Sequence, residues 1–97
     1  MTNRPLAVGL IRHHGDPPVH QRRQTRLAFT AQAALDGYAV VEVFEVDGRP
    51  LRDEATLVQL EACARAAAAH VVLAAGEHDE QRLEAIADRV KMKVRSV

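Results

Sequence analysis

This 97-residue sequence is poor in the residues that hold very small proteins together: it has one cysteine, no tryptophan, one tyrosine and two phenylalanines. The single Cys63 cannot form an intrachain disulfide, and we therefore expect a reduced, cytoplasmic compartment. Net charge is also missing, because 13 Lys and Arg balance 13 Asp and Glu. Since affinity for nucleic acids depends on neutralising several phosphates at once, this balance disfavours nucleic-acid binding by this chain alone.

Long apolar runs are absent as well. The longest uncharged stretch, residues 66–76, is shorter than the ~20 residues that a membrane-spanning helix needs, and it contains His70. The first residues do not have the charged start and apolar run of a signal peptide. We expect no membrane association and one domain over residues 1–97, with a core that suffices for independent folding but leaves little margin.

Short apolar runs alternate with amphipathic stretches along the whole chain. The runs at residues 6–11, 39–46, 70–75 and 92–97 predict four strands. The first and third runs carry no charge, as expected for strands buried on both faces in the centre of a parallel sheet. The second contains two glutamates and the fourth alternates apolar and polar residues, so these two runs predict edge strands.

Each intervening segment has apolar residues three and four positions apart, which predicts a helix. The first helix should begin near residues 19–21, after a turn at residues 15–18, and end at the Asp-Gly pair of residues 36–37. Asp53 and Asp79 are expected to cap the second and third helices. The predicted core consists of Val8, Leu10, Leu27, Ala31, Val41, Val43, Leu57, Leu60, Val72, Leu73, Leu83 and Ile86.

Strands that alternate with helices are joined by right-handed crossovers and therefore pair in parallel. With the charge-free strands in the centre, the predicted fold is a three-layer α/β domain with a four-stranded parallel sheet in the order 2-1-3-4, a reduced flavodoxin-like sheet. In that order the chain reverses direction between the first and third strands, and ligands of open α/β sheets bind at such a switch point. The loops at residues 12–18 and 76–79 meet there.

Three segments of the first half are similar to a known family. They are Ala-Val-Gly-Leu-Ile-Arg at residues 7–12, Gln-Arg-Arg-Gln at 21–24 and Gly-Tyr-Ala-Val-Val-Glu-Val-Phe-Glu-Val-Asp-Gly at 37–48. Together they resemble the start of the serine recombinase (resolvase/invertase) catalytic domain, which has a strand ending Tyr-x-Arg-x-Ser, a helix beginning near Gln and a strand of the type Val-Val-Glu-Val-Phe-Glu-Asp. Residues 57–75 fit the family's second helix and third strand. The resemblance covers nearly the whole chain and implies a resolvase-like fold, and the abundance of alanine and arginine indicates a bacterial source.

The family's catalytic residues are mostly unmatched. Arg12 matches the arginine that neutralises the scissile phosphate in the family, but His14 stands where the resemblance implies the nucleophilic serine. Of the Asp-Arg-x-x-Arg set that follows the family's third strand only Arg82 is matched, and Asp79 takes the place of an arginine. Phosphoryl transfer through a phosphoserine needs both a nucleophile and several cations around the transition state. We therefore expect a catalytically inactive relative that is not an enzyme and has no catalytic residues.

Polar residues of the two switch-point loops are candidates for binding rather than catalysis. Histidines and carboxylates are a workable ligand set for zinc or another transition metal, but the chain has no spaced motif such as His-x-x-x-His. We therefore predict no metal centre and no cofactor. The candidate ligand-binding residues are Arg12, His13, His14, His78 and Arg82.

Two classes of function stay open. The first is a protein-association or regulatory module that forms a homo-oligomer or binds a protein partner. The strand at residues 92–97 is then the expected contact, because only Lys93 and Arg95 protect its edge. The second is a small anion- or metal-binding domain that uses Arg12, the loops after the first and third strands and the backbone amides at the start of the first helix.

Overall fold

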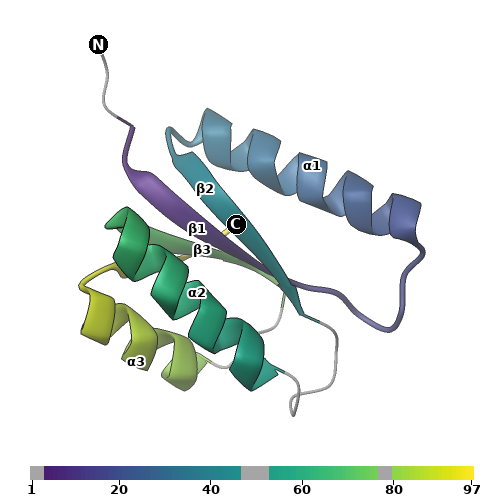
Figure 1. Cartoon of the computed structure of the whole chain (residues 1–97). Coiled ribbons are helices and arrows are strands. Elements are labelled where there is room, and N and C mark those ends of the chain that lie inside the picture. The colour runs from purple at the N-terminus through teal and green to yellow at the C-terminus, as the bar shows by residue number, and fades with distance from the viewer. Residues whose placement is uncertain (1–3, 47–52, 77–79) are drawn as a thin grey trace.

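A computed structural model of the chain describes residues 4–46, 53–76 and 80–97. Four strands and three helices alternate along these residues (Figure 1). In chain order they are β1 (Leu6–Arg12), α1 (Val19–Leu35), β2 (Ala39–Val46), α2 (Asp53–Ala67), β3 (Val71–Ala75), α3 (Glu80–Val90) and β4 (Lys93–Ser96).

The strands form one sheet in the order β2-β1-β3-β4, and every neighbouring pair is parallel. Of the helices in the described residues, α2 and α3 lie on one face of this sheet and α1 lies on the other (Figure 1). This confirms the predicted α/β fold, including the strand order. The physical reason is the distribution of charge: β3 has no charged residue and β1 has one only at its end, Arg12, so both can be buried in the centre, whereas the two more highly charged strands lie at the edges.

The core has two halves, one on each face of the sheet. The larger half packs β1 and β3 against α2 and α3, and Leu60 and Leu83 are its largest fully buried helical side chains. The smaller half lies under α1, which contributes only Phe29 and Ala33. Most of the predicted core is confirmed by this packing: Val8, Leu10, Val43, Leu57, Leu60, Val72, Leu73, Leu83 and Ile86 are buried.

Two predicted core residues of α1 are wrong. Leu27 is 62 % exposed and Ala31 is exposed too, because α1 turns Phe29 and Ala33 toward the sheet. Apolar residues occupy two sides of this helix, and periodicity alone does not say which side meets the sheet. The phenyl ring of Phe29 determines which side of α1 faces the sheet. This aromatic side chain buries more apolar surface than the alanines, and it fits over Gly9 of β1.

The third wrong core residue is Val41 of β2, which is 42 % exposed. The register with β1 shifts between Ala7 and Val8, and Val41 is the extra residue of β2 at that point. Such a bulge interrupts the strict alternation of side chains between the two faces of a sheet. The sequence, read with a period of two, placed Val41 in the core because it contains no signal for this irregularity.

The element boundaries agree closely with the expected ones. The helix α1 begins at Val19 and ends before Asp36 and Gly37, where Gly37 has φ 92° and provides the left-handed cap. The expected capping residue Asp79 lies outside the described residues. Over the ranges that the structure describes, no helix combines the length and apolar character needed to cross a membrane.

Candidate functional site

The switch point lies where the carboxyl ends of β1 and β3 come together. A Cβ atom placed on Gly76, at the end of β3, would be 2.7 Å from the carbonyl oxygen of Arg12, at the end of β1. Gly76 also has φ 84°, a left-handed conformation that favours glycine. The two loops predicted to meet here therefore do start side by side, at Arg12 and Gly76.

Arg12, the last residue of β1, and His13, the first residue after it, point to opposite faces of the sheet. Leu10 belongs to the core half under α2 and α3, whereas Ile11 belongs to the half under α1. Because side chains alternate along a strand, Arg12 continues on the α2 and α3 side and His13 on the α1 side. Neighbouring residues in the sequence thus belong to different sites.

His13 is buried in a small polar cluster at the edge of the sheet. Its side chain is 4 % exposed, and its Nε2 lies 2.7 Å from Oε1 of Glu45 on β2. The other carboxylate oxygen of Glu45 accepts a hydrogen bond from Nη1 of Arg26 on α1 at 3.3 Å, and Nη2 of Arg26 lies 3.5 Å from Oε1 of Glu42. These contacts form a chain from β1 through β2 to α1. The cluster therefore holds α1 against the sheet. Its polar atoms already contact one another and are not available to a ligand.

The other predicted site residues lie apart from His13. His14 is exposed in the loop after β1, and Arg82 lies on α3, where it forms an ion pair with Glu54 of α2. His78 lies outside the described residues. Within residues 4–46, 53–76 and 80–97, no three His, Cys, Asp or Glu side chains are grouped closely enough to hold a metal ion.

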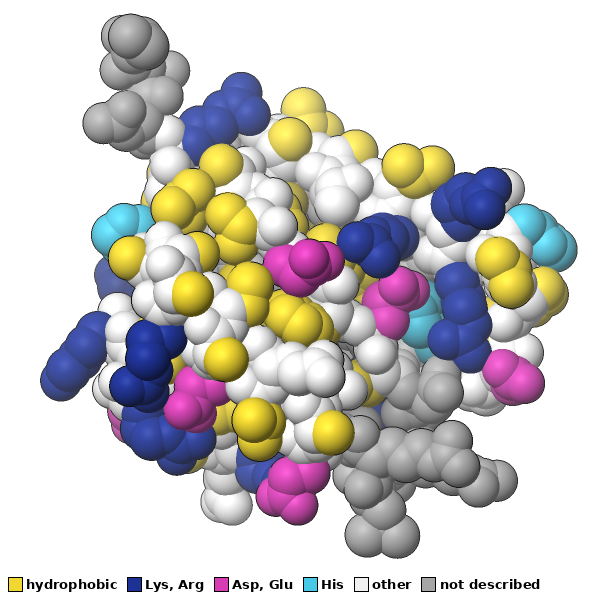
Figure 2. All heavy atoms as spheres, viewed as in Figure 1, with side chains coloured by type: hydrophobic (Ala, Val, Ile, Leu, Met, Phe, Trp, Pro, Cys, Tyr) yellow, Lys and Arg dark blue, Asp and Glu magenta, His cyan; other side chains and the backbone are white. Residues whose placement is uncertain are grey.

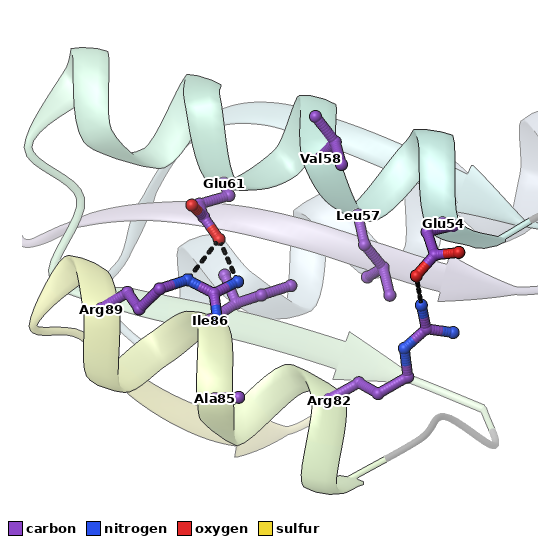
Figure 3. Close-up of a pocket in the computed structure, with 8 residues that line it drawn as sticks. All are labelled: Glu54, Leu57, Val58, Glu61, Arg82, Ala85, Ile86 and Arg89. Atoms are coloured by element: carbon purple, nitrogen blue, oxygen red, sulfur yellow. Dashed lines mark hydrogen bonds and ion pairs between the residues drawn. The ribbon is translucent and has the colours of Figure 1, made fainter.

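A shallow groove runs between α2 and α3 (Figure 3). Its volume is about 260 Å³, below the ~300–1,000 Å³ of typical small-molecule sites. Two ion pairs cross it, each with a glutamate on α2 and an arginine on α3. The charged groups of the groove therefore satisfy one another, and they stabilise the helix pair rather than offer a free binding site. Its lining residues are Glu54, Leu57, Val58, Glu61, Arg82, Ala85, Ile86 and Arg89.

The ion pair between Glu61 and Arg89 is the better defined of the two. Arg89 donates from Nε and Nη2 to Oε1 of Glu61, at 3.0 Å and 2.5 Å. The hydrogen bond from Arg89 lowers the pKa of Glu61, with smaller contributions from the charges of Arg89 and Arg65. The same hydrogen bond raises the pKa of Arg89. Both shifts favour the charged forms, so the pair is ionised at neutral pH.

The side of α1 that faces away from the sheet is apolar over its C-terminal half. We call this surface the outer stripe; its members lie at spacings of one, three, three and one along the helix, so they share one face. Helices that cover a sheet normally present polar residues on this side. Figure 2 shows hydrophobic side chains along the upper margin of the molecule, over α1, and basic side chains toward the N-terminal end of that helix. The outer stripe consists of Leu27, Ala28, Ala31, Ala34 and Leu35, all of them exposed.

Sequence reasoning found part of this surface and misplaced it. Leu27 and Ala31 were expected in the core because they recur at helical spacing, but Leu27 is 62 % and Leu35 82 % exposed. One signal could have revealed the outer stripe: no charged residue occurs between Arg26 and Asp36, on any side of the helix. A helix with only one buried face would carry charges there.

Comparison with known proteins gives no match: no family model, no curated protein and no solved structure matches this chain.

Proposed function

We propose that this chain is a protein-association domain and that the outer stripe of α1 is its contact surface. The observation that carries the proposal is the exposure of Leu27 and Leu35 on a helix whose other side already packs on the sheet. Burying a leucine side chain stabilises a protein or complex by about 1.5–3 kcal/mol relative to leaving it in water. The fold of one chain does not use this free energy at these two residues, so it is available to a protein partner.

The proposal includes a catalytically inactive, resolvase-like character. His14 stands at the position of the nucleophilic serine, and a buried His13 that is already bonded to Glu45 gives no substitute nucleophile there. Arg82 is paired with Glu54 between two helices, which makes it a poor candidate for neutralising a phosphate beside Arg12. Each of these observations supports association over phosphoryl transfer.

The alternative is a small anion- or metal-binding domain built from the loops after β1 and β3. One observation favours it: the contact between Gly76 and Arg12 brings the starts of both loops together. Its ligand would be recognised by Arg12 and by groups of the second loop. Association is preferred because every residue of the outer stripe is exposed on one helix face, whereas two of the proposed ligand-binding residues already have partners. His13 contacts Glu45, and Arg82 pairs with Glu54.

Two measurements on the wild-type chain separate these functions. Sedimentation across a concentration series should give a mass that rises above the 10.7 kDa of one chain. Calorimetry with inorganic phosphate, a nucleotide and zinc should give no saturable heat. A saturable heat that Arg12→Ala removes, together with a constant mass of 10.7 kDa, would overturn the proposal in favour of the alternative.

A matched pair of variants then tests the surface. Leu27→Gln combined with Leu35→Gln should abolish the rise in mass while leaving the unfolding free energy nearly unchanged. Val58→Gln is the control, because Val58 is 65 % exposed on α2 and is comparable in exposure to Leu27. A control variant that weakens association as much as the double variant would show that α1 has no special part in it.

A further inference from the structure

The outer stripe has a two-fold pattern along the helix. Read from residue 27 to 35, its sequence is Leu-Ala-x-x-Ala-x-x-Ala-Leu, which is the same in both directions. Within the outer stripe, residues whose numbers add to 62 are therefore identical in type, Leu27 with Leu35 and Ala28 with Ala34, with Ala31 at the centre. In an isologous contact a two-fold axis can bring residue 27 of one copy against residue 35 of the other, and this pattern then places leucine against leucine at both ends and alanine against alanine between them.

We infer that the partner of the outer stripe is a second copy of this chain, docked with the two α1 helices antiparallel and crossing at Ala31. This inference rests on the proposed function and specifies its partner. Leu27 of one copy then packs against Leu35 of the other at both ends of the contact. The three alanines between them let the helix axes approach to the short end of the ~8–10 Å range of packed helices.

The position of α1 in the fold leaves room for this contact. Among the described helices, α1 alone lies on its side of the sheet (Figure 1), and every residue of its outer stripe is exposed. Two copies can therefore stack with the layers sheet, helix, helix, sheet, and no described element has to move.

Charge complementarity favours the antiparallel arrangement over a parallel one. The N-terminal half of α1 carries Arg22, Arg23 and Arg26, whereas its last turn has no basic residue and is followed by Asp36. Arg22 pairs with Asp16 and Arg26 with Glu45, but Arg23 has no ion pair within the part of the chain that the structure describes.

In an antiparallel pair, the N-terminal half of one α1, with Arg23, lies beside the C-terminal half of the other, toward the negative end of that helix dipole. A parallel pair would instead bring Arg23 beside the Arg23 of the second copy.

The contact is small. A standard stable interface has about 20–30 residues a side, and the outer stripe with its flanking residues is well below this number. We therefore expect a reversible dimer with a micromolar or weaker dissociation constant, not a permanent one.

The test is disulfide cross-linking of the full chain, with Cys63→Ala as the background because Cys63 is the one native cysteine. Ala31→Cys should cross-link to itself under mild oxidation, since the two-fold axis passes between the two copies of this residue. The Leu27→Cys protein should cross-link poorly to itself, and so should the Leu35→Cys protein. A mixture of the two proteins should cross-link well, because residue 27 of one copy then faces residue 35 of the other. In the antiparallel pair two copies of residue 27 are eight residues apart, about 12 Å along the axis, which a disulfide does not span. Val58→Cys is the control for random collision.

The outcomes distinguish this inference from the proposed function. Preferential cross-linking of Ala31→Cys and of the mixed pair supports the antiparallel dimer. Efficient cross-linking of Leu27→Cys to itself would overturn it in favour of a parallel pair. A rise in mass combined with cross-linking at Arg95→Cys on β4, but not at Ala31→Cys, would overturn it while leaving an association function in place. A constant mass with no cross-link above the Val58→Cys level would remove the second copy as the partner.

Discussion

The phenyl ring of Phe29 lies directly over Gly9, so that a Cβ atom placed on Gly9 would be 2.5 Å from Cε1 of the ring. The ring fills the space that a side chain at the centre of β1 would otherwise occupy. This pairing orients α1, because the side of the helix that carries Phe29 has to face the sheet. The outer stripe is exposed as a direct consequence.

Gly9→Ala should therefore destabilise the protein by about 1–3 kcal/mol, the usual cost of forcing extra volume into a packed core. Urea unfolding measures this loss. Phe29→Leu combined with Gly9→Ala should lose less than the sum of the two single changes, because the smaller side chain leaves room for the new methyl group. A Gly9→Ala protein as stable as the wild type would mean that the ring does not sit over β1 in solution.

The same substitution at two leucines should give opposite results. Leu60 is 0 % exposed in the core under α2 and α3, and Leu60→Ala should lower the free energy of unfolding by about 2–5 kcal/mol. Leu27→Ala should change it by less than ~0.5 kcal/mol when measured on the monomer at low concentration. Equal losses for both variants would contradict the orientation of α1.

Glu45→Ala tests the polar cluster at the edge of the sheet. It would leave the buried imidazole of His13 without its carboxylate partner, at a cost of about 1–3 kcal/mol in unfolding free energy. Arg26→Ala should cost less than ~1 kcal/mol, since the side chains of its ion pairs are partly exposed to solvent. Chemical denaturation of both variants is the measurement, and a larger loss for Arg26→Ala would reverse the proposed order of importance.

The ion pair of Glu61 makes the stability depend on pH in a defined direction. Its pKa is lowered in the folded protein from an ordinary value of 4.5, so its stabilising contribution is fully present above that value and is lost as the pH falls through the lower folded pKa. Glu61→Gln should accordingly be less stable than the wild type at pH 7, and the difference should shrink in acid. Glu84→Gln is the control, because Glu84 is exposed on α3 without an ion pair among the described residues. If the difference in unfolding free energy between the wild type and Glu61→Gln stays constant down to low pH, Glu61 does not have this role.

His14→Ser should not give this protein recombinase activity. The variant would supply a hydroxyl nucleophile two residues after Arg12. Of the further arginines that the resemblance implies after the third strand, only Arg82 is matched in the sequence, and Arg82 pairs with Glu54, so charge on a phosphoryl transition state should remain unsupported. Incubation with supercoiled DNA, followed by separation of protein–DNA adducts under denaturing conditions, should give none for the wild type or the variant. A covalent adduct with either protein would show that catalysis is retained.

The sequence by itself determined the layered α/β architecture of this protein and the order of its strands. Charge-free runs have to lie in the centre of a parallel sheet because both of their faces are buried, and runs with charges have to lie at its edges. The helices followed from apolar spacing, and the end of α1 followed from an Asp-Gly pair. These properties depend on neighbouring residues along the chain, which the sequence displays directly.

The tertiary structure decided which side of α1 is buried and where the polar residues of the expected site went. Leu27 and Phe29 are both apolar, and only the match between the phenyl ring and Gly9 of β1 selects one side. Arg12 and His13 are adjacent in the sequence but separate onto two faces of the sheet, and His13 finds its partner 32 residues away, in Glu45. Contacts between residues far apart along the chain depend on shape and distance in three dimensions. Spacing in the sequence does not contain that information, because several partners satisfy the same local pattern.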